Sequence, residues 1–216
     1  MPPIVCVVGL SDSGKTTFLE KLIAELKGRH YRVAAVKHDT HGFDLDKPGK
    51  DSWRLAQAGS DCVVISSAQR LGLIKNVERD STLEELARVI GEDYDIILTE
   101  GFKQSRAPKI EVHRREVGSQ LLCRPEELIA VATDEPLETD APQFPLDDAR
   151  GIADIVEFGV LSQRPAQEMT LYVNGAAVPL HPFVKDMMGK AVLGMVNSLK
   201  GVGDPTAVEL TIRVRG

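Results

Sequence analysis

The first residues whose types and spacing could do chemistry form the run Gly9-Leu-Ser-Asp-Ser-Gly14-Lys15-Thr16, which matches the pattern G-x-x-x-x-G-K-[ST]. In this pattern the glycines let backbone N–H groups turn inward around a β-phosphate, and the N-terminus of the following helix adds partial positive charge. Lys15 supplies a point charge to the β- and γ-phosphates, and the Thr16 hydroxyl is free for Mg²⁺. The run predicts a nucleotide-phosphate site.

Magnesium on a nucleotide also takes carboxylate ligands, and the run Asp95-Ile-Ile-Leu-Thr-Glu100-Gly101 offers two of them. Asp95 begins and Glu100 ends a predicted strand, which places them about 16 Å apart, so only Glu100 can face the phosphates. Gly101 lets the backbone pass close to the γ-phosphate. We expect Thr16 and Glu100 to hold the metal, with Lys15 and Glu100 taking part in catalysis.

The segment from Lys37 to Ser52 gathers many charged and imidazole side chains after a second predicted strand, and we expect it to form a loop over the active edge. Asp39 lies where a carboxylate could orient Mg²⁺ or an attacking water, so it is a third candidate catalytic residue. Four further side chains mix ligand types that could hold a transition metal, although their spacing matches no standard zinc pattern: His38, His41, Asp44 and Asp46. A solvated loop is the alternative interpretation of these four.

Two later stretches could contact a nucleotide. Ile129-Ala-Val-Ala-Thr133-Asp134 reads as a buried strand that ends in a hydroxyl and a carboxylate, and a carboxylate can accept from guanine N1–H and N2–H₂. A turn-forming aspartate is the simpler interpretation. Lys109-Ile-Glu-Val-His113 reads as a charged edge strand, after which Arg114 or Arg115 could reach an anionic ligand.

Alternating strands and helices must position these groups. Helical periodicity runs from Phe18 to Leu26 and stops at Gly28, and further helices are predicted over Leu83–Ile90 and Ile152–Leu161. The segment between Asp134 and Asp148 is rich in proline and acidic residues and is predicted to be a loop. Short apolar strands are predicted at 3–8, 33–36, 62–65, 71–74, 96–99, 110–112 and 129–132. The alternation indicates an α/β fold of the P-loop NTPase type, a mainly parallel sheet flanked by helices, over residues 1–163.

The pattern changes after Gln163-Arg-Pro165, which indicates a second, small α+β module over residues 166–216. Asn174-Gly175 between two apolar triplets predicts a tight hairpin. An apolar helical stripe from Phe183 to Leu199 and an alternating run from Val208 to Val214 complete a predicted ββαβ order. About 50 residues bury too little surface to be very stable alone, so we expect this module to be an accessory contact surface.

Composition excludes several classes of protein. The net charge of −6, the absence of a basic run and the ten aromatic residues disfavour a nucleic-acid groove. The apolar stretches fall far short of the roughly 20 residues that cross a bilayer, and no basic leader opens the chain, so we expect a soluble cytoplasmic protein that binds no membrane. The three cysteines are far apart and lack C-x-x-C spacing, which predicts reduced, partly buried thiols.

Several of these stretches together closely resemble the molybdopterin-guanine dinucleotide biosynthesis protein B family over about residues 3–160. The runs at 41–52 and 99–103 are more specific to that family than the phosphate pattern. The resemblance is carried by Gly9–Thr17, Lys37–Asp39, His41–Ser52, Thr99–Lys103 and Pro108–Arg114.

The resemblance implies a homodimeric protein that binds GTP and Mg²⁺, hydrolyses GTP feebly and assists the guanylyltransferase that joins GMP to molybdopterin. On this basis Thr16 and Glu100 hold Mg²⁺, and Thr133 and Asp134 contact the base. The phosphates and the loop around them fall to Gly9, Ser11, Asp12, Ser13, Gly14, Lys15, Thr16, Thr17 and Gly101. Two alternatives use the same cradle: a small-molecule kinase, for which no arginine-rich lid stands out, and a GTP-driven metal-insertion chaperone.

Overall fold

The computed structural model describes residues 1–39, 42–43, 46–163 and 169–214. The chain divides into two compact units, Met1–Gln163 and Arg164–Gly216, and each is described by itself. Within the described residues, no helix combines the length and the apolar character needed to span a bilayer.

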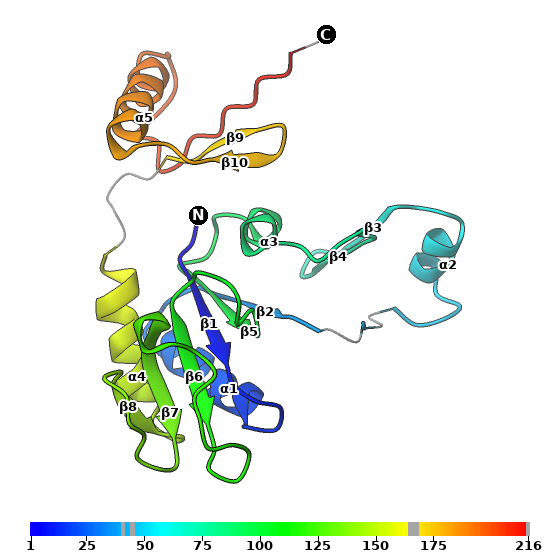
Figure 1. The fold of residues 1–216 in the computed structure, drawn as a ribbon. Helices are drawn as coiled ribbons and strands as arrows, with labels where there is room; N and C mark the ends of the chain where they lie inside the picture. Colours follow the sequence, from blue (N-terminus) through cyan, green and yellow to red (C-terminus); the bar gives the residue numbers. More distant parts are fainter. Residues whose placement is uncertain (40–41, 44–45, 164–168, 215–216) are drawn as a thin grey trace. The chain divides into compact units, whose positions relative to one another are not determined.

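The first unit is built on a six-stranded parallel sheet (Figure 1), as the alternation of strands and helices predicts. Its spatial order is β2-β5-β1-β6-β7-β8, and every neighbouring pair is parallel. The strands are β1 (Ile4–Val8), β2 (Val33–Lys37), β5 (Ile96–Glu100), β6 (Lys109–His113), β7 (Leu128–Thr133) and β8 (Gln143–Pro145). The carboxyl ends of β1, β5, β6 and β7 therefore meet at one edge of the sheet.

Both faces of the sheet are covered, so its central strands are apolar on both sides. On one face Val5 and Val7 pack with α1 (Lys15–Gly28) and α4 (Ala149–Val156). On the other face Cys6 and Val8 pack against Cys123, Val131 and their neighbours. Helix α3 (Leu83–Ile90) covers Ala34 and Ile97 on β2 and β5.

The C-terminal end of helix α1 is joined to Glu157 by charged hydrogen bonds, and the helix also packs on the sheet through apolar side chains. Leu22 and Leu26 are fully buried. At the end of the helix, Arg29 donates to Glu157 at 2.6 Å, and the Tyr31 hydroxyl donates to the same carboxylate at 2.8 Å. These bonds hold the pKa of Glu157 below its usual range. Glu157 begins the π-helix η2 (Glu157–Leu161), which continues α4 and completes the helix predicted over 152–161.

Both strands predicted over 62–65 and 71–74 are present, as β3 (Cys62–Ser66) and β4 (Leu71–Lys75). They pair with each other as a separate antiparallel hairpin, because a short connection cannot make a parallel crossover. Two other predicted features of the first unit are wrong in detail. The predicted loop between 134 and 148 contains β8, a short edge strand whose end tolerates a proline. Of the cysteines, Cys6 and Cys123 are buried but Cys62 is exposed. Two short helices complete the unit, α2 (Asp51–Gln57) and η1 (Pro125–Glu127).

The second unit contains a hairpin and a helix. Strands β9 (Leu171–Val173) and β10 (Ala176–Val178) are antiparallel, and the turn between them places Asn174 and Gly175 at φ values of 50° and 84°, as the Asn-Gly pair predicts. Helix α5 runs over Pro182–Asn197. Among the described residues, the segment 208–214 forms no strand and pairs with none, so the prediction of a last strand there is wrong.

Candidate nucleotide-binding site

The predicted phosphate loop, Gly9 to Gly14, connects the carboxyl end of β1 to the first residue of α1. Gly9 has a φ of +151°, and a Cβ there would lie 2.4 Å from the Val112 carbonyl oxygen, so a side chain is excluded. Gly14 occupies the position before the helix at φ +90°, and no side chain caps the helix there. The N-terminus of α1 therefore keeps its first N–H groups available to an anion.

An open depression of about 460 Å³ lies against the loop and the first turn of α1. The fold brings Glu100 to it from 84 positions further along the chain, because β5 pairs directly with β1. The depression contains most of the predicted phosphate-binding residues, and its lining consists of Ser11, Asp12, Gly14, Lys15, Thr16, Thr17 and Glu100.

The predicted magnesium ligands touch each other in this depression. The Thr16 hydroxyl donates to Glu100 Oε2 at 2.7 Å, and the Glu100 side chain is only 13% exposed. Lys37, at the end of β2, places its ammonium 3.9 Å from the other carboxylate oxygen. Mg²⁺ prefers oxygen ligands, and these two side chains offer oxygen atoms beside the predicted phosphate loop.

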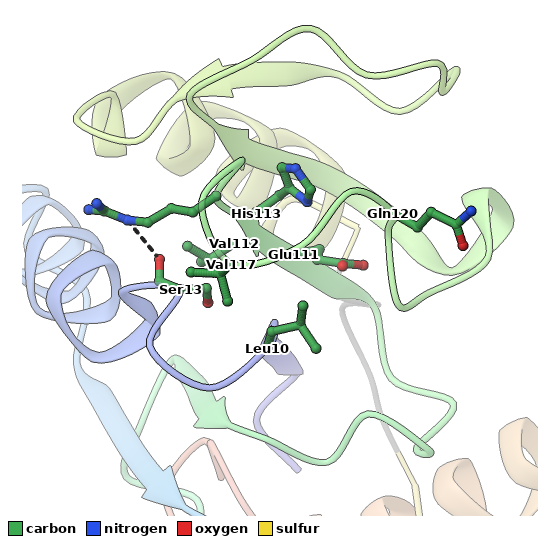
Figure 2. Close-up of a pocket in the computed structure, with 8 residues that line it drawn as sticks. Leu10, Ser13, Glu111, Val112, His113, Val117 and Gln120 are labelled. Carbon is green, nitrogen blue, oxygen red and sulfur yellow. Dashed lines mark hydrogen bonds between the residues drawn. The ribbon is translucent and has the colours of Figure 1, made fainter.

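Lys15 and Arg114 bring positive charge to opposite sides of the loop. The Lys15 ammonium donates to the Leu10 carbonyl at 2.6 Å, which uses one of its three donors. Arg114 Nε donates to the Ser13 carbonyl at 3.2 Å, the dashed line in Figure 2. The guanidinium group also lies about 3.5 Å from the point where a Cβ on Gly14 would be, so it stands beside the N-terminus of α1.

Ser13 lies behind the loop rather than in the depression. Its side chain is 1% exposed, and its hydroxyl has no partner among the described residues. It lines a small hollow together with Leu10, Val112 and Val117 (Figure 2). The prediction that Ser13 contacts the phosphates therefore stays a prediction.

The contacts of His38, which follows β2, explain why residue 101 is a glycine. Gly101 has a φ of +103°, and a Cβ there would lie 3.2 Å from His38 Cβ. The His38 ring packs against Phe102 with a centroid distance of 4.7 Å, and its Nε2 lies 3.3 Å from Asp80. Gly101 thus allows His38 to pack closely at the end of β5.

The proposed metal ligands of this segment do not form a cluster within the described residues. There, no group of three histidine, cysteine, aspartate or glutamate side chains could hold a metal ion. Asp46 accepts from the Ser52 hydroxyl and the Lys47 amide, while His41 and Asp44 lie outside the described residues. Asp39 is exposed after β2 and is not among the residues that line the depression.

The predicted base-binding pair lies at the same edge of the sheet, two strands from β1. The Thr133 hydroxyl donates to the Glu135 carbonyl at 2.8 Å, and Asp134 Oδ1 accepts from the Arg115 amide at 2.9 Å. Asp134 is exposed and keeps its second oxygen. Neither residue lines the depression at the phosphate loop.

Strand β6 is not an edge strand, so that prediction is wrong. It lies between β1 and β7, and all five of its residues are buried. Lys109 donates to the Ser105 carbonyl and to Glu127, at 2.6 and 3.1 Å. A charged alternation normally indicates a solvated face, and only the loop that folds over this one reveals the burial.

The other two polar side chains of β6 also have partners. Glu111 accepts from the amides of Leu122 and Cys123 at 2.6 and 3.0 Å, and His113 Nε2 lies 3.0 Å from Glu135. Burial, with a contribution from Glu111, raises the pKa of the Cys123 thiol to about 11. These bonds hold the loop after β6 against the sheet and so help to position Arg114 beside the phosphate loop.

Comparison with known proteins agrees with this arrangement. The sequence model of the family "MobB: Molybdopterin guanine dinucleotide synthesis protein B" matches residues 4–134. The molybdopterin-guanine dinucleotide biosynthesis adapter protein of Haemophilus influenzae is 42% identical over 72% of this chain and 88% of its own length. A Methanocaldococcus jannaschii protein aligns at 26% identity over 98% of this chain and 97% of its own length, so that alignment extends into the second unit.

Solved structures lead to the same family. The crystal structure of Bacillus subtilis MobB superposes with a TM-score of 0.58 at 29% identity, covering 75% of this chain and 99% of that one. The family match spans the phosphate loop, Glu100 and the strands that bring them together. The chain belongs to the molybdopterin guanine dinucleotide synthesis protein B family.

Proposed function

We propose that this protein is a GTP-binding adapter in the biosynthesis of molybdopterin guanine dinucleotide, with Mg²⁺ as its metal and weak GTP hydrolysis. The observation that carries the proposal is the 2.7 Å contact between Thr16 and Glu100 beside an uncapped helix N-terminus. The curated relative from Haemophilus influenzae bears the adapter name. Membership of the family supports this role rather than a small-molecule kinase or a metal-insertion chaperone.

The residues of the depression fit a magnesium nucleotide. The N-terminus of α1 and the Lys15 ammonium would meet the phosphate charge, and Thr16 and Glu100 would hold the metal through oxygen. When bound, Mg²⁺ neutralises charge that develops on the β- and γ-phosphates. Asp39 is the candidate to orient an attacking water, from its exposed place after β2.

Guanine selection is assigned to the turn after β7. Asp134 would accept from the N1–H and N2–H₂ groups of guanine through the carboxylate oxygen that Arg115 leaves open, and Thr133 orders the turn. The protein would act in the cytoplasm, as a homodimer, on the guanylyltransferase that joins GMP to molybdopterin. The relative is named an adapter protein, which supports the proposal that this protein acts on a partner enzyme.

The decisive experiment measures Mg²⁺–GTP binding by calorimetry for the parent and two lysine variants. Lys15→Ala should lower affinity about 100-fold or more, because it removes a cation that serves two phosphates. Lys27→Ala removes an exposed lysine from the last turn of the same helix and should change nothing. Equal GTP affinity in the parent and in Lys15→Ala would reject the site.

A further inference from the structure

Arg114 is the first residue after β6, and its side chain lies against the phosphate loop. Its Nε donates to the Ser13 carbonyl at 3.2 Å, the dashed line in Figure 2. Its Nε and one terminal nitrogen lie 3.5 and 3.6 Å from the point where a Cβ on Gly14 would be, and Gly14 lines the depression. The guanidinium group therefore stands at the edge of the proposed nucleotide site.

The turn that begins at Arg114 packs on the same loop, which limits where the guanidinium group can reach. The Arg114 carbonyl accepts from the amides of Val117 and Gly118 at 3.0 and 3.2 Å. Gly118 lies so close to Leu10 of the phosphate loop that a Cβ there would be 2.5 Å from Leu10 Cδ1. Both the backbone turn and the side chain of Arg114 are thus held at the loop, and such preorganisation lowers the entropy cost of binding.

Most of the donors of Arg114 are left for a ligand. A guanidinium group has five N–H donors, and the Ser13 carbonyl takes one of them. In the part of the chain that the structure describes, no carboxylate lies within 4 Å of its nitrogens. Lys21 donates to Asp147 and is the main reason that the pKa of Asp147 lies below its usual range, while the charge of Arg114 contributes less. A charged, planar fork of N–H groups suits a phosphate.

The order of the strands sets the direction in which a nucleotide would lie. Strands β5, β1, β6 and β7 are neighbours in this order (Figure 1), about 4.8 Å apart. Glu100 ends β5, the phosphate loop leaves β1, and Asp134 follows β7. With the metal at Glu100 and the base at Asp134, the β- and γ-phosphates lie towards β5, because the metal bridges them. The α-phosphate, which carries the ribose, then lies towards β6, where Arg114 stands.

We propose that Arg114 binds the α-phosphate of a guanine nucleotide and so makes the site select nucleotides over inorganic pyrophosphate. This inference rests on the proposed function, because it uses the roles proposed there for Glu100 and Asp134. GTP and GDP offer the same α-phosphate, so Arg114 contributes equally to the binding of both. Pyrophosphate with Mg²⁺ offers only the two phosphates that the metal bridges, so it does not reach Arg114.

The test is calorimetry of the full-length parent and three variants with Mg²⁺ and GTP, GDP or pyrophosphate, with circular dichroism to check each fold. Arg114→Ala should lower the affinities for GTP and GDP by the same factor, about tenfold or more, and that for pyrophosphate less than about twofold. Arg114→Lys keeps the charge but not the fork, so it should recover part of the loss.

The matched control is Arg150→Ala, which removes an exposed arginine from α4 and changes the net charge by the same amount. The Arg150 main-chain carbonyl accepts from Arg29, which follows the C-terminal end of α1, so this side chain belongs to the end of the helix away from the phosphate loop. The variant should bind all three ligands like the parent.

Each way in which the inference could fail has its own result. Equal GTP affinity in the parent and in Arg114→Ala would show that the guanidinium group does not touch the nucleotide. An equal loss for pyrophosphate would mean that Arg114 only supports the loop through Ser13, and a loss for GTP but not for GDP would place it at the γ-phosphate. A parent that binds no GTP would reject the proposed function itself, and this inference with it.

Discussion

The parallel sheet of the first unit and helix α5 of the second unit bury their apolar residues to very different extents. Val5, Ile96 and Ala130 are completely buried, because helices or loops cover both faces of the sheet. Along α5 only Gly189 is buried, and Phe183 and Met195 are more than half exposed. The first unit can therefore hold a phosphate loop rigidly by itself, whereas the second unit can gain stability by contact with another surface.

The largest expected effect tests this comparison with one substitution made in both regions. Leu22→Ala removes a fully buried side chain from α1 and should cost about 2–5 kcal/mol in the free energy of unfolding. Leu199→Ala removes a side chain that is 58% exposed just after α5 and should cost less than about 0.5 kcal/mol. Urea unfolding of both variants makes the comparison, and equal costs would show that the end of α5 is buried in solution.

The next effect concerns whether the first unit carries the base specificity. Asp134→Asn keeps an acceptor for the Arg115 amide but should shift preference from guanine towards xanthine, whose C2 carbonyl accepts where guanine donates. Each lost charged contact should cost about 1.5–3 kcal/mol in GTP affinity. Competition binding with GTP, XTP and ATP measures it, and Asp140→Asn in the following loop is the control. A parent protein that binds ATP as tightly as GTP would exclude this assignment.

A smaller effect separates a buried ion pair of the first unit from an exposed one of the second. The buried Lys109 ammonium holds the pKa of Glu127 below its usual range, so this pair stabilises the fold above the ordinary glutamate pKa and is lost as pH falls through the folded value. Glu127→Gln should lower the unfolding temperature at pH 7 and flatten its fall towards acid. Asp186→Asn, which breaks the exposed pair with Lys190, should leave the curve unchanged. Identical thermal curves for parent and Glu127→Gln from pH 3 to 7 would contradict the buried pair.

The smallest effect is expected when the second unit is removed. Truncation after Gln163 should change GTP affinity by less than about twofold, because every residue assigned to the nucleotide lies before position 135. The same truncation should weaken self-association. Calorimetry and sedimentation of the truncated chain measure both, and a folded truncation that no longer binds GTP would mean that the second unit completes the site.

The phosphate loop was the part of the site most open to prediction, because its chemistry is local. Gly9, Gly14, Lys15 and Thr16 fall within a run of eight residues, so their spacing contains the information for the backbone conformation and the side-chain types of the loop. Glu100 was predictable for a related reason, since a carboxylate at the end of a buried strand must face the edge where parallel strands end. The Asn174-Gly175 turn was equally local.

Tertiary structure alone decided which strands are neighbours and which charges are buried. Lys109 and Glu111 alternate with apolar residues as they would on a solvated edge, and only the loop over β6 supplies their partners. The contact between Arg114 and Ser13 likewise joins elements that are distant in sequence. Residue types and periodicity determine local conformation and which face is apolar, whereas burial of a charge depends on which distant groups the fold brings to satisfy it.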